Sequence, residues 1–360
     1  MRILFIAQHR PQRSPSQRFR FEQYLDHFAS QGIHYDFSYL IDEEDDKVFY
    51  AKGNLRKKAA IVLKSWQRRM KDVKRADTYD IIFVQREAFM TGTTFFERSF
   101  ANSKAKLVFD FDDSIWLHNV SDANRYLNFL KNPQKTASII ALADHVIAGN
   151  EYLAAFAKGR NHNVSIIPTT IDTESYVPGQ RQNDQGPVTI GWSGSITTIQ
   201  HFNLAEATLK RLKAKYKDRI AIKVIGDANY RNEALDVQGI GWSAATELDD
   251  LRSMDIGIMP LPDDEWAQGK CGLKGLQYMA LGIPTIMSPV GVNKQIIEDG
   301  SNGFLASEED TWFEKLSLLI DHPELRTRLG EAGRATVEEA YSVKANADKY
   351  SSVFEAVLSA

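Results

Sequence analysis

The sequence contains a single cysteine, Cys271, among 360 residues. One thiol excludes an intramolecular disulfide and a cysteine metal cluster, and it fits a reducing, cytoplasmic setting. The sequence also lacks any stretch close to the roughly 18 apolar residues that a helix needs to span a bilayer. The apolar run at the N-terminus is too short for a signal peptide, so we interpret it as a first buried strand.

A strong excess of one charge is absent as well. The 44 lysines and arginines nearly balance the 47 acidic residues, which leaves a net charge of −3. Proteins dedicated to nucleic acid are usually strongly basic, so we expect no nucleic-acid partner. The remaining composition, with 43% hydrophobic and 25% charged residues, is that of an ordinary globular protein, and the length favours two domains.

Short apolar segments alternate with longer amphipathic ones along the chain. In the first half, strands are expected at Arg2–Ala7, Tyr35–Leu40, Asp80–Gln85, Lys106–Phe111, His145–Ala148 and Val164–Ile167, with a helix at Ser14–Gln31. A polar segment, Gly179–Gln185, has the composition of a linker. After it, strands are expected at Val188–Trp192, Ala221–Ile225, Asp255–Met259, Thr285–Met287 and Phe304–Ala306, with helices at Asn203–Lys217 and Lys274–Leu281.

This alternation predicts parallel sheets covered by helices on both faces. Because the series breaks near residue 180 and then starts again, the predicted fold class is α/β, with two doubly wound, Rossmann-like domains facing across a cleft. Ligands of such sheets bind outside the carboxyl ends of the strands, so we look for chemistry in the loops that follow strands.

Four arginines follow the first expected strand: Arg10, Arg13, Arg18 and Arg20. They lie close to the expected start of a helix, where anions are favoured, so we expect at least one to contact a phosphate-bearing ligand. In the alternative, some of them are solvated surface residues. No G-x-G-x-x-G fingerprint is present here, which argues against a dinucleotide-dependent dehydrogenase.

Three carboxylates, Asp110, Asp112 and Asp113, lie within four residues at the end of an expected strand. Their mutual repulsion is unfavourable, and such clusters occur more often at functional sites than by accident. We therefore expect Asp112 or Asp113 to face the cleft. In the alternative, Asp113 caps the next turn and Asp110 pairs with a nearby arginine.

The strand that ends at Trp192 is followed by Ser193-Gly194-Ser195-Ile196-Thr197-Thr198. Small hydroxyl residues around a glycine, leading into a helix, form a cradle for phosphate, since amides and hydroxyls donate to it and the helix dipole helps. The Gly-Lys-Ser/Thr ending of a P-loop is missing. The alternative is a simple helix N-cap.

An acidic loop, Asp263-Asp264-Glu265, precedes Gly269-Lys270-Cys271-Gly272 and a helix with Lys274 in its first turns. A lysine near a helix N-terminus opposes the macrodipole, so we expect Lys274 to have an anionic partner. In the alternative, that partner is the acidic loop. Cys271 is most simply a small buried hydrophobic residue.

The following segment carries a resemblance to a known family. Gly272-Leu273-Lys274-x-Leu276-Gln277-Tyr278-Met279-Ala280-x-Gly282-x-Pro284 resembles the G-L-x-x-x-E-A-M-A-x-G-x-P signature of family-4 glycosyltransferases of the GT-B fold. Ser288-Pro289-Val290-Gly291 and Asp299-Gly300-x-x-Gly303-Phe304-Leu305 follow at the usual spacing. Upstream, Ile167-Pro168-x-x-Ile171-Asp172-x-x-x-Tyr176 resembles the entry to the family's second domain. The match covers roughly residues 145–345.

The resemblance implies a nucleoside-diphosphate sugar held by the C-terminal domain and an acceptor on the N-terminal one. It implies transfer with retention at the anomeric carbon, and neither a metal nor another cofactor. The leaving diphosphate develops negative charge, which Lys274 and the Ser193–Ser195 amides would stabilise as an oxyanion hole does. Asp112, roughly where many members have a histidine, would orient the acceptor hydroxyl for attack on the same face.

Residue by residue, Lys274 corresponds to a lysine near the donor pyrophosphate, and Gln277 to the second glutamate of the Glu-x7-Glu motif, which binds ribose. Glutamine keeps an acceptor and adds donors. Gly269 stands in place of the first glutamate, which touches the donor sugar, and Asp264 or Glu265 could replace it by folding back. Trp242 follows a strand end near the expected position of the base; a core position is the alternative.

The predicted catalytic residues are Asp112 and Lys274. The predicted donor-binding residues are Ser193, Gly194, Ser195, Thr197, Gly226, Trp242, Lys270, Gly272, Leu273 and Gln277. The predicted residues for the acceptor or elsewhere in the cleft are Arg18, Arg20, Asp113, Asp264 and Glu265, and no metal ligand is expected. The acceptor domain is predicted at residues 1–178 and the donor domain at 186–340, with a C-terminal helix in 341–360 that crosses back to the first.

Lys52–Arg75 is strongly basic, with ten lysines and arginines against one acid, Asp72. Apolar residues recur in it at helical spacing: Leu55, Ala59, Val62, Trp66, Met70 and Val73. A basic amphipathic helix with a tryptophan is typical of an anchor on anionic lipid, so we expect a peripheral protein on the inner face of the cell membrane. In the alternative, the apolar side of the helix docks on its own domain.

The sequence therefore favours a glycosyltransferase that builds a cell-surface polysaccharide or glycolipid. Two other functions remain open: a nucleotide-sugar epimerase of the same architecture, and a non-catalytic partner that only binds the sugar nucleotide. The sequence identifies neither the sugar, the base nor the acceptor.

Overall fold

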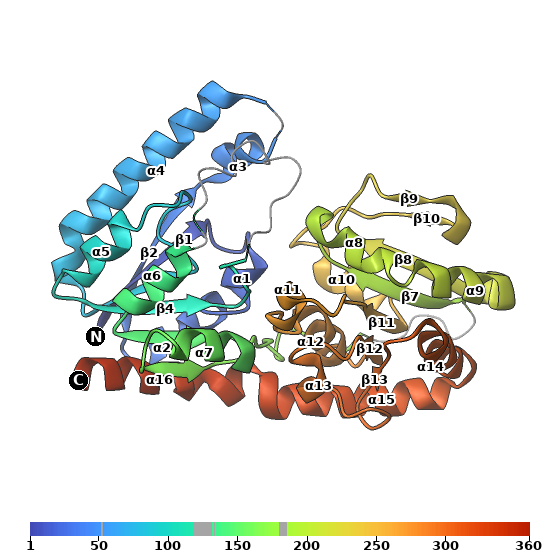
Figure 1. The fold of residues 1–360 in the computed structure, drawn as a ribbon. Helices are drawn as coiled ribbons and strands as arrows, with labels where there is room; N and C mark the ends of the chain where they lie inside the picture. Colours follow the sequence, from blue (N-terminus) through green and yellow to red (C-terminus); the bar gives the residue numbers. More distant parts are fainter. Residues whose placement is uncertain (52, 118–131, 133, 180–185) are drawn as a thin grey trace. The chain divides into compact units, whose positions relative to one another are not determined.

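The computed structural model describes residues 1–51, 53–117, 132, 134–179 and 186–360. The described chain forms two compact units, shown in Figure 1: unit 1 comprises Met1–Pro168 and Ala347–Ala360, and unit 2 comprises Thr169–Asn346. The sequence placed the corresponding boundaries at 178 and 341. The expected linker, Gly179–Gln185, lies outside the described residues except for Gly179.

Unit 1 is built on a six-stranded sheet in the order β2-β1-β3-β4-β5-β6, with every pairing parallel. Its strands are β1 (Arg2–His9), β2 (His34–Ile41), β3 (Ile81–Gln85), β4 (Lys106–Phe111), β5 (His145–Ala148) and β6 (Val164–Ile166). The inner strands β1, β3, β4 and β5 are buried over most of their length and mainly apolar, as expected for a parallel sheet covered on both faces. The edge strands β2 and β6 are largely half-buried.

The helices of unit 1 are α1 (Pro15–Arg18), α2 (Leu25–Ser30), α3 (Glu43–Phe49), α4 (Leu55–Arg75), α5 (Phe95–Ala101), α6 (Gln134–Leu142), α7 (Glu151–Lys158) and the end of α16 (Val343–Ser359). On one face of the sheet, Phe354 of α16 packs against Phe28 of α2 and Phe83 of β3. Helices α4 and α5 lie on the opposite face (Figure 1). There Trp66 of α4 packs edge-on against Phe96 of α5.

The helix predicted at Ser14–Gln31 is interrupted. Helix α1, a 3-10 turn (Glu22–Tyr24) and α2 occupy this range. Phe19, Arg20 and Phe21 lie between α1 and the turn, and all three side chains are buried. Three consecutive residues of a continuous helix point in different directions and cannot all face one core, so the break lets each be buried.

Unit 2 contains a five-stranded parallel sheet in the order β13-β12-β11-β7-β8. The strands are β7 (Val188–Ser193), β8 (Ile220–Ile225), β11 (Ile256–Met259), β12 (Thr285–Met287) and β13 (Phe304–Leu305). A short antiparallel pair, β9 (Arg231–Asn232) and β10 (Val237–Gln238), was not predicted. After β10, Ile240 continues the sheet by pairing in parallel with Ile225 of β8.

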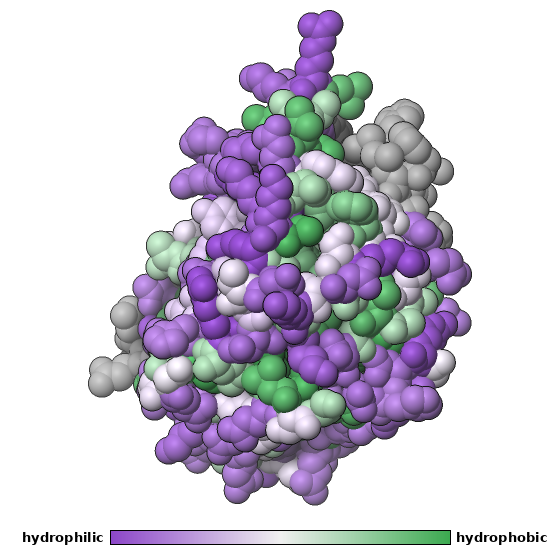
Figure 2. Space-filling model, turned by 90° about the vertical axis from the view of Figure 1, so that its left-hand side faces the viewer, coloured by the Kyte–Doolittle hydropathy of each residue, from purple (hydrophilic) through white to green (hydrophobic). Residues whose placement is uncertain are grey.

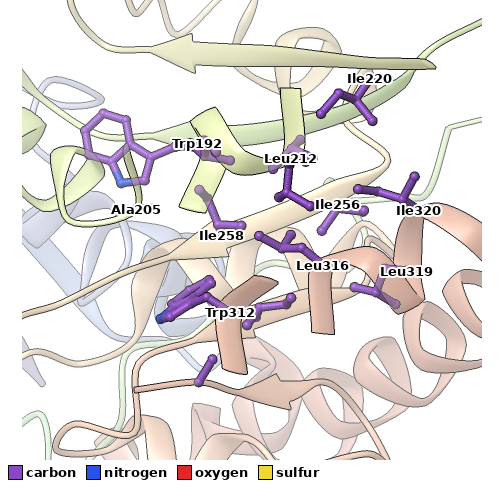
Figure 3. Packing of buried hydrophobic residues seen from close by; sticks show 14 of the residues in the cluster. Trp192, Ala205, Leu212, Ile220, Ile256, Ile258, Trp312, Leu316, Leu319 and Ile320 are labelled. Atoms are coloured by element: carbon purple, nitrogen blue, oxygen red, sulfur yellow. The ribbon is translucent and has the colours of Figure 1, made fainter. Parts of the chain in front are cut away.

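The helices of unit 2 are α8 (Ile199–Asn203), α9 (Glu206–Tyr216), α10 (Glu247–Arg252), α11 (Glu265–Gln268), α12 (Leu273–Ala280), α13 (Asn293–Ile296), α14 (Glu309–Asp321) and α15 (Pro323–Thr336). Figure 3 shows one side of the core, in which Leu316 and Leu319 of α14 pack with Ile256 and Ile258 of β11. Both units are thus doubly wound, which confirms the predicted α/β class.

Candidate functional site

The candidate site of unit 2 lies at the carboxyl edge of its sheet. Strand β8 lies on one side of β7 and strand β11 on the other, so the strand order reverses at β7. Doubly wound sheets bind ligands at such switch points. The segment Ser193–Thr198 follows β7 directly, and Lys270 and Lys274 belong to the connection that follows β11.

Close backbone packing shapes this edge. A Cβ on Gly194 would lie 2.2 Å from Cη2 of Trp192, and a Cβ on Gly226 would lie 2.3 Å from the Gly194 carbonyl oxygen. Gly226 also has a φ of 130°, and Gly272, before α12, has a φ of 70°. These three predicted donor residues are glycines because the loops after β7 and β8 touch and because α12 begins from a left-handed backbone.

The structure corrects the predicted use of the amides in this loop. The amide of Ser193 donates to the Tyr278 hydroxyl at 2.7 Å, and that of Gly194 donates to the Ile225 carbonyl at 2.9 Å. The Ser195 amide donates to the Thr198 hydroxyl at 2.9 Å within a capping box. These amides therefore hold the loop, and the exposed hydroxyls of Ser195 and Thr197, 3.0 Å apart, are the groups that it presents.

Lys274 lies in the first turn of α12, as predicted, directly after Leu273. Its ammonium is 5.6 Å from the centroid of the Trp192 ring, which places it beside the end of β7. The backbone dipole at this end of α12 repels a cation and attracts an anion. Lys274 and the hydroxyl loop together therefore form a place suited to a phosphate group.

A histidine that the sequence analysis did not identify lies beside these lysines. His201 of α8 is buried, and its Nδ1 has no hydrogen-bond partner in the part of the chain that the structure describes. Burial, followed by the positive charges of Lys274 and Lys270, lowers the pKa of His201 to about 4, against the opposing charge of Asp264. His201 is therefore neutral near pH 7. No sequence motif marked it, because its neighbours come from α12 and the preceding loop.

The acidic loop leads into α11. The Asp264 carboxylate caps α11 by accepting from the Ala267 amide at 2.7 Å, and Glu265 is the exposed first residue of that helix. Lys270 lies 5.3 Å from the centroid of the Trp266 ring. Cys271 is buried, as predicted.

A second cluster in unit 2 surrounds Glu247, at the start of α10. Its Oε1 accepts from Trp242 Nε1 at 2.9 Å and from Gln277 Nε2 at 3.4 Å, and its Oε2 accepts from the Tyr176 hydroxyl at 3.1 Å. Gln277 also donates to the Tyr176 hydroxyl at 2.9 Å. Trp242 and Gln277 were predicted as donor residues, and Tyr176 belongs to the motif that resembles the entry to the second domain. Glu247 was not predicted, although it lies only five residues after Trp242.

Unit 1 carries its own polar cluster, at the switch point between β1 and β3. Arg86 follows β3 with a left-handed φ of 61°, and its Nε donates to Asp112 Oδ1 at 2.7 Å. Asp113 lies 3.5 Å from the same guanidinium. His9, at the end of β1, is 3.2 Å from the Tyr50 hydroxyl, and burial followed by the charge of Arg13 lowers its pKa to about 4. Arg86, His9 and Tyr50 were not predicted.

Arg20, which was predicted to face the acceptor or the cleft, is instead a buried structural residue. It is 1% exposed, and its guanidinium donates to both oxygens of Asp110 and to the Ile167 carbonyl. Asp110 thus pairs with an arginine, but with one 90 residues away along the chain, whereas the alternative expected a local one. The buried pair joins the segment after α1 to β4 and to the end of β6.

The other predicted arginines are also engaged. Arg10 and Arg13 both donate to Asp46 of α3, so these two do not form an open anion site by themselves. The guanidinium of Arg18 lies 5.0 Å from the centroid of the Phe19 ring.

Helix α4 begins at Leu55 and confirms the predicted helix. The residues that it buries are not the apolar ones that recur at helical spacing in the sequence. The buried positions are Lys58, Ile61, Ser65, Arg69 and Asp72. Arg69 is fully buried and donates to the carbonyls of Ala7 and Ala88, so the helix is attached to the sheet largely through polar contacts. Leu55 and Leu63 remain 71% and 60% exposed.

No helix among the described residues combines the length and the apolar character that crossing a membrane requires. The same residues contain no group of three or more His, Cys, Asp and Glu side chains arranged to hold a metal ion.

Residues 187–322 match the model of a family described as Glycosyl transferases group 1. Spore coat protein SA of Bacillus subtilis (strain 168) is 22% identical in an alignment over 247 residues that covers 61% of this chain. The chain spans 65% of the length of that relative.

Solved structures resemble this chain in fold over nearly its full length. The structure of Anabaena Alr3699/HepE in complex with UDP-glucose is similar with a TM-score of 0.68 and 14% identity, over 99% of this chain and 100% of that one. A glycosyltransferase from Rickettsia africae ESF-5 is similar with a TM-score of 0.69 and 14% identity, over 99% and 98% of the two chains. These similarities confirm the predicted GT-B fold.

Proposed function

We propose that this chain, whose residues 187–322 form a glycosyl transferases group 1 domain, is a retaining family-4 enzyme that transfers a sugar from a nucleoside-diphosphate sugar to a hydroxyl of a lipid-linked or polysaccharide acceptor. Its role would be the synthesis of a cell-surface glycan. The protein in the Anabaena structure binds UDP-glucose, which supports a nucleotide-sugar donor for the related fold.

The observation that carries the proposal is the position of Lys274. Its ammonium lies beside the ring of Trp192 in β7 and at the positive end of α12, and the loop that follows β7 presents the hydroxyls of Ser195 and Thr197. A diphosphate leaving group gains negative charge as the anomeric bond breaks. A fixed cation and oriented hydroxyls stabilise that charge in the transition state. Lys274 would thus supply charge that a metal ion supplies in other transferases, and we expect no metal requirement.

For the acceptor we propose Asp112. Its carboxylate is fixed by Arg86 at the end of β4 and would accept a hydrogen bond from the attacking hydroxyl. In a retaining reaction on one face of the sugar, the departing phosphate takes the proton of that hydroxyl. Asp112 then acts by orienting the acceptor.

The test is incubation with a panel of nucleotide-sugars. Release of nucleoside diphosphate that depends on an acceptor supports the transferase. An isomerised sugar would indicate an epimerase. Binding without turnover would indicate a non-catalytic partner, an alternative that arises because Gly269 replaces the glutamate expected to touch the donor sugar.

Calorimetry measures diphosphate binding directly. Lys274→Gln should weaken this binding about 10- to 100-fold, because a charged hydrogen bond is lost. Lys210→Gln, on α9 and paired with Glu206, is the matched control.

We also propose that α4 attaches the protein to an anionic membrane surface, on the inner face of the cell membrane, where a lipid-linked acceptor would be available. Figure 2 views the side of the molecule on which α4 lies and shows hydrophilic side chains with hydrophobic ones between them. Leu55 and Leu63 are exposed on this helix, as are the cations Arg56, Lys57 and Lys71.

A further inference from the structure

We propose that Glu247 binds the ribose hydroxyls of the donor nucleotide, through the carboxylate that Trp242, Tyr176 and Gln277 hold at one end of unit 2. The inference rests on the proposed function, because it needs a nucleotide at the site. It adds a specificity-determining residue that the sequence signature does not mark.

The carboxylate of Glu247 is fixed from three directions. An indole N–H at 2.9 Å, a phenol hydroxyl at 3.1 Å and a carboxamide at 3.4 Å all donate to it. Each of these three donors is neutral, and together they orient the carboxylate. Glu247 is 8% exposed and Tyr176 is 5% exposed, so their contacts form in a largely water-free place, where hydrogen bonds to a charge are strong.

The chemistry of the cluster suits a vicinal diol. A carboxylate only accepts, and it has room for several donors, so two neighbouring hydroxyls can bind it together. In doubly wound nucleotide-binding sheets, an acidic side chain near the carboxyl ends of the strands accepts hydrogen bonds from the ribose hydroxyls. The Gln277 contact, at 3.4 Å, is the longest of the three and is the one that a ribose hydroxyl would replace.

The spacing on α12 connects this cluster to the phosphate site. Lys274 and Gln277 are three residues apart on the same helix, so their side chains lie on one face about one turn, or ~5 Å, apart. A diphosphate at Lys274 would therefore place the adjoining ribose near Gln277 and Glu247. Trp242 belongs to the loop that follows Ile240, which pairs with β8, so it comes from the same edge of the sheet.

The geometry also explains why residue 277 is a glutamine. A glutamate there would bring a second carboxylate to about the same distance from Glu247, and two like charges so close disfavour ionisation of both. The amide instead donates to Glu247 and to Tyr176. The family resemblance predicts a carboxylate at position 277. In this chain Glu247 of α10 would supply that carboxylate instead.

The experiment measures ribose preference rather than affinity alone. Uridine, guanosine and adenosine diphosphates are each compared with their 2′-deoxy forms by calorimetry on the full chain. For the base that binds best, we expect the ribo form to bind about 10- to 100-fold more tightly, as for the loss of one hydrogen bond to a charged group. Glu247→Gln should reduce this preference to a few-fold at most. Asp249→Asn, an exposed carboxylate on the same helix, should leave it unchanged.

A purely structural role for Glu247 would weaken both forms equally and preserve their ratio, and that result would overturn the inference. Equal binding of the ribo and deoxy forms by the unaltered protein, with sugar transfer intact, would also overturn it while leaving the proposed function standing. Failure to bind any diphosphate would overturn the proposed function and this inference together. If Glu247→Gln proves unfolded by its melting curve, Tyr176→Phe decides the question: it removes one orienting donor and should lower the preference, and an unchanged ratio would count against the inference.

Discussion

Arg86 Nε lies 2.7 Å from Oδ1 of Asp112, and Arg86 itself has a left-handed backbone with φ of 61°. A non-glycine residue in that region costs about 1–3 kcal/mol, and such residues cluster at functional sites. The strained arginine therefore fixes a carboxylate at the carboxyl end of β4, beside the switch point of the sheet of unit 1.

Asp112→Asn should lower kcat about 100-fold, since the neutral amide no longer orients the acceptor hydroxyl through a charge. The affinity for nucleoside diphosphate, measured by calorimetry, should not change, because the phosphate site lies in unit 2. Asp26→Asn, an exposed carboxylate in unit 1, serves as the control. Undiminished turnover of Asp112→Asn would remove the assigned role.

Gly194→Ala should destabilise unit 2 by about 1–3 kcal/mol, because the added methyl would overlap the buried ring of Trp192. Urea unfolding followed by fluorescence would measure the change. Gly186→Ala is the matched control, since a Cβ there meets no atom within 4 Å. An equal loss in the two variants would show that the loop after β7 is not tightly packed.

Breaking the buried ion pair of Arg20 and Asp110 should cost unit 1 much more unfolding free energy than breaking an exposed pair. Asp110→Asn leaves a buried guanidinium without its carboxylate and should cost about 3–5 kcal/mol of unfolding free energy. Glu44→Gln, which breaks the exposed pair with Lys47, should cost about 0–1 kcal/mol. Similar values for the two variants would contradict the buried geometry.

The strands could be predicted well from the sequence because a fully buried parallel strand is a short, continuous apolar run. Strands β4, β5 and β12 have the predicted bounds. The break at Phe19–Phe21 could not be predicted, because it depends on Asp110, which is 90 residues away and pairs with Arg20. The short pair β9 and β10 has strands of two residues, too short for an alternation to be recognised.

The candidate site was predictable where it follows strand ends and unpredictable where it depends on contacts between distant segments. Lys274 and the 193–198 loop stood out because of their place after β11 and β7. Glu247 meets Tyr176 across 71 residues and Gln277 across 30, and nothing at position 247 alone marks it. The amides of Ser193 and Gly194 were assigned to phosphate because their partners, Tyr278 and Ile225, are equally remote.

Acid should destabilise both units in the same pH window. Burial lowers the pKa of His9 and of His201 to about 4, from an ordinary value of 6.5. Above pH 6.5 both are neutral whether folded or unfolded, so the full stability is present there. As the pH falls from 6.5 to 4, the unfolded chain binds protons that the folded chain does not, and stability is lost. His201→Leu should flatten this dependence for unit 2 in urea titrations at pH 7, 5.5 and 4.5. An unaltered slope in His201→Leu would contradict the buried, neutral state of this histidine.

Flotation with vesicles tests the proposed membrane surface of α4. Lys64 and Arg68 of this helix are paired with Asp42, so the cations available to lipid include Lys71 and Lys74, both exposed. The protein should float with vesicles containing phosphatidylserine and stay in solution with neutral ones. Each of Lys71→Gln and Lys74→Gln should weaken binding roughly fivefold, since a cation near an anionic surface contributes about 1 kcal/mol.

Two further variants separate charge from insertion on α4. Leu63→Gln should weaken binding to anionic vesicles at high as well as low salt, because the exposed leucine would enter the lipid, whereas the effect of the lysine variants should fade as salt screens the charges. Lys158→Gln, an exposed lysine at the end of α7, controls for net charge. If the unaltered protein does not float with anionic vesicles at low salt, α4 is not a membrane anchor, and its exposed leucines and lysines need another explanation.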